Sequence, residues 1–167
     1  YIFADPYYLP MEFRPAFAER CVDLDCVVPF HPPAMAPKVA DTSTRDGKPI
    51  TFGSFNRVLK ITAVGVRRWA AVLHSVPGSR MVLKAPGFDS DPVRRDVAVL
   101  FGKAGIEESR LCFRGKTSRY QHLEVYGHVD IALDTFPHGG GVTTWESLYM
   151  GVPMVVFAGE SAGQRAS

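Results

Sequence analysis

A glycine-rich turn carries the residues of this chain that are best suited to chemistry. Residues 134–148 read DTFPHGGGVTTWESL, so three glycines and two threonines precede a carboxylate one turn into a short helix. Glycines let a backbone approach an anion without interference from Cβ, and the N–H groups of the first helical turn point at that anion. We expect Thr143 and Thr144 to cap this helix. The stretch predicts a site for a phosphorylated nucleotide; the alternative is a loop that only turns the chain.

Two carboxylates flank the glycines, and we expect different roles for them. Glu146 would repel a phosphate, so its natural partner is a pair of sugar hydroxyls further along the same ligand. Asp134 stands at the end of the preceding strand, where it is expected to orient the turn rather than to donate a proton.

Strands and helices alternate after residue 50, and this order decides where the site lies. We expect strands at 50–55, 80–84, 110–113, 129–134 and 153–157, and helices at 62–76, 91–105, 118–126 and 143–150. Thr62, Asp91 and Ser118 are the expected caps. The alternation predicts an α/β fold, a Rossmann-like parallel sheet of about five strands with flanking helices.

Ligands of such sheets gather at the carboxyl ends of the strands. The chain places residues 56–60, 84–89 and 114–122 there, together with the glycine loop. The first of these loops lacks the GxGxxG fingerprint of dinucleotide binding, which argues against a nicotinamide or flavin dehydrogenase and moves phosphate binding to the glycine loop.

Composition limits the class of protein and divides the chain. The 167 residues are 46% hydrophobic, 22% charged and carry a net charge of +2, too little to indicate binding to nucleic acid or to an acidic membrane. Cys21, Cys26 and Cys112 lack CxxC spacing, so neither a disulfide framework nor a metal site is expected. Without a membrane span or signal peptide, a cytoplasmic location is expected. Frequent prolines make 1–49 a connecting segment before a domain at 50–167.

Short motifs spread along the chain resemble those of one enzyme family. They lie at 52–56, 60–62, 76–80, 130–134, 139–140, 143–144, 146–148 and 151–153. Together they resemble the O-GlcNAc transferase and SPINDLY family, in its bacterial branch. Its members are inverting, metal-independent glycosyltransferases of the GT-B architecture, often with tetratricopeptide repeats upstream. The resemblance implies that the chain is the second, donor-binding domain and stops before that domain is complete.

The resemblance assigns a catalytic role to one lysine. Lys60 resembles the family lysine that contacts the donor diphosphate and stabilises its charge as the sugar departs; without the resemblance, a solvated surface lysine would be expected. An ammonium fixed beside a leaving diphosphate can take the place of a magnesium ion. Arg57 stands where relatives commonly carry glutamine, and it is a candidate phosphate contact.

Further residues match donor contacts of the family. The set comprises Thr117, Arg119, His122, His138, Gly140, Gly141, Val142, Thr143, Thr144 and Glu146. In the family, the counterpart of His122 lies against base and ribose, that of Arg119 lies near the ribose, and that of Glu146 holds the ribose hydroxyls. The backbone around Thr117 is expected to read the base edge, and His138 to face the sugar. Alternatively, both histidines are structural or solvated.

The implied enzyme uses UDP-GlcNAc as co-substrate, without a cofactor, and transfers GlcNAc to serine or threonine of a polypeptide. The acceptor would bind a missing N-terminal domain and its repeats, so we expect the fragment alone to be inactive. Val125, Gly141 and Val142 differ from some relatives, which leaves base and sugar open. The alternatives are a docking module with a vestigial nucleotide site and a GT-B transferase that acts on a glycan or small molecule. Apolar surface exposed by the early end would favour a dimer.

Overall fold

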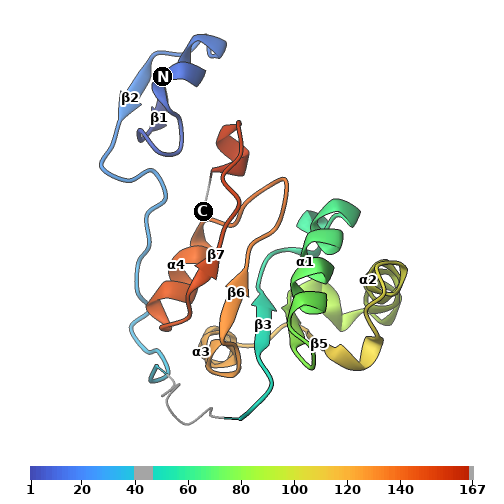
Figure 1. The fold of residues 1–167 in the computed structure, drawn as a ribbon. Coiled ribbons are helices and arrows are strands. Elements are labelled where there is room, and N and C mark those ends of the chain that lie inside the picture. The colour runs from blue at the N-terminus through green and yellow to red at the C-terminus, as the bar shows by residue number, and fades with distance from the viewer. Residues whose placement is uncertain (40–46, 166–167) are drawn as a thin grey trace.

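The chain forms two parallel β-sheets of different size in the computed structural model, which describes residues 1–39 and 47–165. The strands are β1 (Ile2–Ala4), β2 (Cys21–Asp23), β3 (Thr51–Ser54), β4 (Arg80–Lys84), β5 (Leu111–Arg114), β6 (Ile131–Leu133) and β7 (Met154–Val155). The helices are α1 (Ala63–Ser75), α2 (Asp91–Lys103), α3 (Arg119–Glu124) and α4 (Val142–Tyr149). β1 and β2 pair with each other, and the other strands form one sheet in the order β5-β4-β3-β6-β7 (Figure 1).

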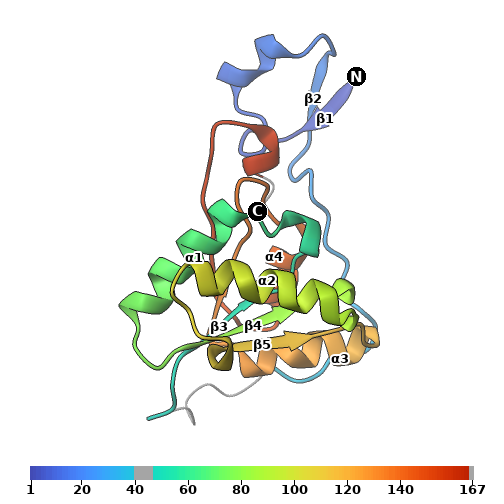
Figure 2. The same cartoon turned by 90° about the vertical axis from the view of Figure 1, so that its right-hand side faces the viewer.

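Helices cover both faces of the larger sheet, which confirms the predicted α/β fold. One face packs against α1 and α2 through a cluster that includes Phe52, Trp69, Leu73, Met81 and Phe101. The other face carries α3 and α4 and a second cluster that includes Phe55, Leu123, Tyr126, Val129 and Met150. Figure 2 shows α1 and α2 on the opposite side of the sheet from α3. None of the helices in the described ranges is long and apolar enough to cross a membrane.

The order of the strands opens a crevice at the middle of the sheet. From the central strand β3, the chain adds β4 and β5 on one side and then β6 and β7 on the other. The loop after β3 therefore runs to α1 on one face, and the loop after β6 runs to α4 on the opposite face. Ligands of open α/β sheets bind where two such loops part at the carboxyl ends of neighbouring strands.

Helix starts follow the predicted caps in two cases and depart from them in two. The Thr62 side chain accepts the Gly65 N–H at 3.0 Å, and Ser118 forms a capping box with Gln121. Asp91 is not a cap: Ser90 precedes α2, and Asp91 lies in the first turn, where it pairs with Arg94.

The predicted threonine cap of α4 is also wrong. Gly141 occupies the N-cap position without a side-chain hydrogen bond, at φ 104° and ψ −106°. An L side chain is strained in this conformation, so the glycine is required for the chain to turn into α4. Thr143 and Thr144 consequently lie inside the first turn of the helix.

Some strands and helices begin or end at other residues than predicted. β7 spans two residues rather than five and pairs with β6 at the edge of the sheet. β6 begins at Ile131, and the Asp130 carboxylate before it accepts the Thr51 N–H at 2.8 Å. α3 ends at Glu124 and continues as a 3-10 turn to His128.

The N-terminal segment is more ordered than its prolines suggest. Besides β1 and β2, it contains a 3-10 helix at Met11–Ala16, and Figure 1 shows this part in blue, above the larger sheet. Residues 27–30 form no strand. The Asp5 carboxylate accepts N–H groups of Tyr7, Tyr8 and Val27 at 2.7–2.9 Å and joins the two ends of the segment. The division of the chain near residue 50 stays a prediction.

Gly53 in the central strand tests how tightly this sheet packs. A Cβ at Gly53 would lie 2.7 and 2.8 Å from the two Cγ atoms of buried Val129. Gly53→Ala is therefore expected to reduce the free energy of unfolding by about 1–3 kcal/mol, seen as a lower urea midpoint.

Gly102→Ala is the matched control, because Gly102 is exposed in α2 and a Cβ there has no atom within 4 Å. That variant is expected to be as stable as the unaltered chain or up to about 1 kcal/mol more stable. Equal midpoints for the two variants would contradict the close packing of Gly53 on Val129.

Candidate functional site

A cleft of about 390 Å³ lies in the crevice between the loops that follow β3 and β6. Its lining residues are Phe55, Asn56, Arg57, Lys60, His138, Gly140, Val142 and Thr143. The two loops that the sequence analysis singled out thus face each other across one cavity. The volume is in the range of small-molecule sites.

Lys60 is held by the glycine loop rather than by solvent. It ends a 3-10 turn, Val58–Lys60, and its Nζ donates to the carbonyl oxygens of Gly139 and, at 3.4 Å, of Gly140. Partial burial lowers the pKa of Lys60; Asp134 opposes and Arg57 adds to this effect, and the net shift is downward. The Lys60 side chain therefore lines the cleft, anchored by its backbone in the turn after β3 and by its ammonium on the glycine loop.

Asp134 orients the glycine turn, as predicted. One carboxylate oxygen accepts the Asn56 side-chain N–H and the other accepts the Gly140 N–H, both at 3.0 Å. The Asp134 carbonyl accepts the indole N–H of Trp69, also at 3.0 Å. The turn is thereby attached to the end of β3 and to α1.

The start of α4 presents unpaired donors at the cleft. Val142 and Thr143 of the first turn line the cleft, and their N–H groups come before the first hydrogen bond of the helix, which the Thr144 N–H donates to the Gly141 carbonyl at 2.9 Å. Thr143 Oγ1 lies 3.4 Å from Asn56 Oδ1, whereas the Thr144 hydroxyl is buried without a hydrogen-bond partner among the described residues. A Cβ at Gly140 would lie 2.6 Å from Thr143 Oγ1, so only glycine fits against these threonines.

Glu146 is the most buried carboxylate near the cleft, with 3% of its surface exposed. Arg119 donates to its Oε1, His122 Nε2 lies 3.0 Å from its Oε2, and the Tyr126 hydroxyl donates to Oε2 at 3.4 Å. The structure thus brings together three residues that the resemblance assigned to one ribose. Burial raises the pKa of Glu146, but the hydrogen bonds from His122 and Arg119 outweigh burial, so the pKa lies below its ordinary value.

Aromatic contacts fix the histidine of this group. The rings of Phe55 and Tyr126 stack at 3.7 Å, and the His122 ring packs edge-on against both, at 5.6 and 6.0 Å. Burial and the Glu146 charge raise the pKa of the Tyr126 hydroxyl well above its usual value, so it remains a donor. The sequence analysis missed Tyr126, although its spacing of four residues from His122 is the signal for a shared helix face.

The loop after β5 leads to the predicted base-reading segment. Thr117 is exposed just before the capping residue Ser118. The Asp89 carboxylate accepts the Lys116 N–H at 3.1 and 3.2 Å, and Lys84 Nζ donates to the Gly115 carbonyl. Lys84, expected at the ligand edge of the sheet, is instead 2% exposed and supports this loop from below.

His138 has a packing partner that its sequence neighbourhood does not reveal. It lines the cleft, and a Cβ at Gly163 would lie 2.9 Å from its Nδ1. The Gly139 N–H donates to the Gly163 carbonyl at 2.9 Å. The 3-10 turn Ala162–Gln164 therefore lies against the glycine loop. No periodic pattern in the sequence signals this contact.

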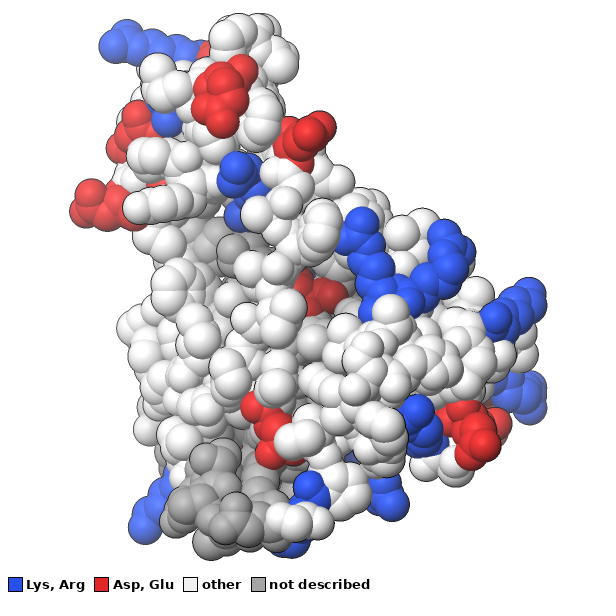
Figure 3. Space-filling view, in the orientation of Figure 1, with Lys and Arg blue, Asp and Glu red and all other residues white. Residues whose placement is uncertain are grey.

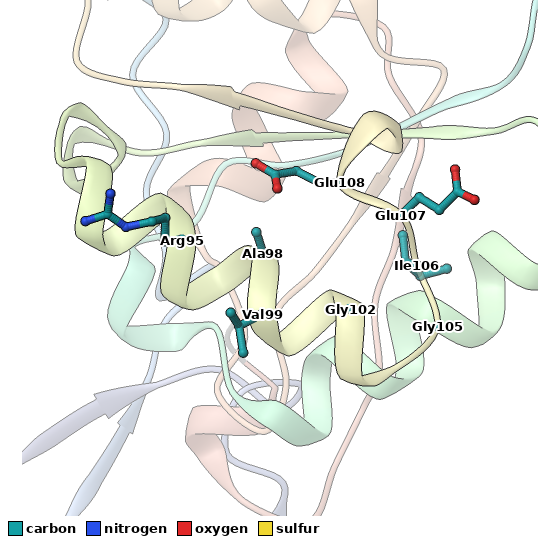
Figure 4. Close-up of a pocket in the computed structure, with 8 residues that line it drawn as sticks. All are labelled: Arg95, Ala98, Val99, Gly102, Gly105, Ile106, Glu107 and Glu108. Atoms are coloured by element: carbon teal, nitrogen blue, oxygen red, sulfur yellow. The ribbon is translucent and has the colours of Figure 1, made fainter.

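Other features of the described residues do not compete with this cleft. No group of three or more His, Cys, Asp or Glu side chains there could hold a metal ion. Figure 3 shows Lys and Arg in separate groups over one face, not in a continuous basic surface. A hollow of about 660 Å³ lies along α2 (Figure 4), with Arg95 and Glu107 at its two ends and Ala98 and Val99 between them. It lies outside the crevice and lacks a glycine loop.

Comparisons with known proteins agree with the fold and with these motifs. The model of glycosyl transferase family 41 matches residues 41–167. The chain is 38% identical over 152 residues to a probable UDP-N-acetylglucosamine–peptide N-acetylglucosaminyltransferase SPINDLY of Arabidopsis thaliana, covering 90% of this chain and 17% of that protein. It is 28% identical over 119 residues to the UDP-N-acetylglucosamine–peptide N-acetylglucosaminyltransferase of Caenorhabditis elegans, covering 71% of this chain and 10% of that protein.

A solved structure extends the similarity over nearly the whole chain. The K341M mutant of the Thermobaculum terrenum O-GlcNAc transferase superposes with a TM-score of 0.90 at 32% identity, covering 98% of this chain and 31% of that one. The chain spans less than a third of each of these relatives.

The ion pairs of Glu146 predict how stability depends on pH. Glu146→Gln removes the charge that Arg119 and His122 bind, and is expected to reduce the free energy of unfolding by about 1–3 kcal/mol at neutral pH. The pKa of Glu146 in the folded protein lies below the ordinary value of 4.5. The ionised carboxylate therefore stabilises the fold at pH values above 4.5. Its contribution is lost as the pH falls through the folded pKa.

Urea midpoints at a series of pH values measure this effect. The difference between the unaltered chain and Glu146→Gln should be largest near neutral pH and vanish in acid. Glu124→Gln is the matched control, since Glu124 is exposed at the end of α3 and the variant changes the net charge equally. A pH-independent difference for Glu146→Gln would exclude the charged hydrogen bonds as its cause.

Proposed function

This chain belongs to glycosyl transferase family 41, and from that premise we propose that it is the nucleotide-sugar-binding half of an inverting, metal-independent protein O-glycosyltransferase. We propose that the full-length protein transfers GlcNAc from UDP-GlcNAc to serine or threonine hydroxyls. The observation that carries the proposal is that Lys60 and the start of α4 line one cleft, with the Glu146 group next to it through the contact of His122 with the lining residue Phe55.

The diphosphate of the donor fits the Lys60 side of the cleft. There, the N–H groups at the start of α4 and the Lys60 ammonium can share its charge, with the Thr143 hydroxyl, which lines the cleft, as a further donor. Arg57 is exposed at the rim of the same cleft. Cations and backbone donors at these positions can do the work of a divalent metal ion.

The ribose and base fit the Glu146 side. Glu146 Oε1 is bound by Arg119, whose side chain is 47% exposed. A ribose diol can take the place of Arg119 on Oε1 without disturbing His122 and Tyr126, which bind Oε2. Arg119 can then contact the ligand, and the His122 ring lies next to Arg119 on the same carboxylate.

Transfer with inversion requires little covalent chemistry from this half. The acceptor oxygen bonds to the anomeric carbon on the face opposite the diphosphate, and the bond from that carbon to the β-phosphate oxygen breaks. Lys60 and the start of α4 stabilise the charge that develops on the diphosphate. We place the base that takes the acceptor proton outside this chain: His74 and His128 do not line the cleft, and His138, which does, is assigned to the sugar.

The relatives support the donor and the acceptor class by name. The plant and nematode proteins are both described as peptide N-acetylglucosaminyltransferases that use UDP-N-acetylglucosamine. Since this chain spans a small part of each, the polypeptide acceptor and any tetratricopeptide repeats are proposals for the full-length protein.

Ligand binding separates the roles of Lys60 and Glu146. In the full-length protein, UDP should bind about tenfold or more tightly than uridine, and its affinity should fall with added salt but survive chelation of divalent metals. Lys60→Ala should remove most of the difference between UDP and uridine. Glu146→Gln should weaken both ligands alike, because the ribose is common to both. Calorimetry measures all four effects.

Lys103→Ala on the exposed side of α2 is the control for Lys60→Ala. Equal affinities for uridine and UDP, or a requirement for magnesium, would show that the glycine loop has a purely structural role.

GDP is the control for the base: if GDP binds more tightly than UDP, the uridine assignment is wrong while the diphosphate site stands. Tight nucleotide binding without any transfer would favour a docking module with a vestigial site.

The 167 residues by themselves should bind nucleotide weakly and transfer nothing, because the acceptor site and base are placed elsewhere. They should also self-associate through the apolar surface of the β7 edge, where Val155, Val156 and Phe157 are exposed. A transfer assay with UDP-GlcNAc and light scattering on the purified chain check both points. Measurable transfer, or a monomer at high concentration, would contradict the corresponding expectation.

A further inference from the structure

We propose that Asp134 is a positioning residue, which holds the glycine loop and Lys60 in the arrangement that receives the donor diphosphate. Its effect on a ligand rests on the function proposed above, whereas its effect on Lys60 does not. Asp134 lines no part of the cleft and would repel a phosphate, so it is expected to act through its neighbours.

The carboxylate joins two loops that are distant in the sequence. Asn56, which follows β3 and is 5% exposed, donates to Oδ1, and Gly140 of the glycine loop donates to Oδ2. The Gly140 N–H is therefore directed to Asp134. That N–H group is therefore not a donor for a phosphate. The backbone donors that can bind the phosphate follow Gly141, in the first turn of α4, and we expect the anion site to lie at that turn.

An asparagine can replace this carboxylate only if the neighbouring Asn56 amide also turns. Both carboxylate oxygens accept from an N–H group, whereas an amide offers one acceptor and one donor. The amide nitrogen would therefore face either the Gly140 N–H or the Asn56 NH₂. Reversing the Asn56 amide would relieve the second conflict, because the Thr143 hydroxyl, which now donates to Asn56 Oδ1 at 3.4 Å, can instead accept from the Asn56 NH₂. Asp134→Asn therefore removes the negative charge and changes the contact between Asn56 and Thr143 at the cleft.

The charge of Asp134 also acts on Lys60. Burial lowers the pKa of Lys60, Asp134 raises it from the end of β6, and Arg57 lowers it from the turn before Lys60. His138 of the glycine loop lines the same cleft. Among these groups, Asp134 supplies the negative charge that opposes the effect of burial on the Lys60 pKa.

Asp134→Asn and Asp130→Asn form a matched pair that tests the proposal in the full-length protein. Asp130 lies at the other end of β6, where its carboxylate also accepts a backbone N–H, from Thr51. Titration of ¹³C-labelled lysine, with the Lys60 signal assigned from Lys60→Arg, gives the pKa of Lys60 without any ligand. That pKa should fall in Asp134→Asn and stay unchanged in Asp130→Asn.

UDP binding gives a second, independent measurement. The protonated ammonium is the form that binds a diphosphate, so a lower Lys60 pKa makes the affinity decline at a lower pH on the alkaline side. Asp134→Asn should show this shift and should bind UDP about 10- to 100-fold more weakly. Asp130→Asn should bind UDP as the unaltered protein does, even where urea shows an equal loss of stability.

The outcomes separate this proposal from the proposed function. If Lys60 titrates alike in both variants, Asp134 is not its positioning residue. If the Lys60 pKa falls in Asp134→Asn alone but no nucleotide binds the unaltered protein, the positioning role stands and the proposed function fails. If Asp134→Asn does not fold, Asp134→Glu is used instead. This variant keeps the negative charge, so the pKa of Lys60 should stay unchanged, whereas UDP should bind more weakly because the longer side chain displaces the glycine loop. Unweakened UDP binding by that variant would overturn the proposal.

Discussion

The Glu146 carboxylate, buried beneath the start of α4, is the constraint on which one half of the crevice depends. A charged group in such a place is destabilising unless donors surround it. Its three donors, Arg119, His122 and Tyr126, all come from α3 and the 3-10 turn that continues it. The two helices on this face of the sheet are therefore fixed relative to each other by hydrogen bonds to one charge as well as by apolar contact.

Local patterns in the sequence were sufficient to predict much of the fold. The alternation of apolar strands with helices predicted the parallel sheet, and Ser118 as a cap predicted the start of α3, because both depend on residues close in the chain. Strand ends were less predictable: β7, the last strand in the order of the sheet, spans two residues where five were expected. The start of α4 was misplaced because the conformation of Gly141, and not a side-chain cap, turns the chain there.

The contents of the site were harder to predict, because its contacts join residues far apart in the sequence. The resemblance supplied Lys60, His122 and Glu146, and the structure shows what holds each of them. Nothing in the spacing of Lys84 indicated that it lies buried under Gly115, or that Asn56 meets Asp134. Such contacts depend on the register of neighbouring strands, which the periodicity of a single strand does not reveal.

The indole of Trp69 is 4% exposed and donates its N–H to the Asp134 carbonyl, at the point where β6 becomes the glycine loop. An indole is a fluorophore whose emission depends on the polarity and hydrogen bonding around it. The chain has one other tryptophan, Trp145, which lies partly exposed on α4. Replacing Trp145 by phenylalanine would leave Trp69 as an intrinsic optical reporter, located behind the loop and outside the cleft, of whether that loop keeps its shape.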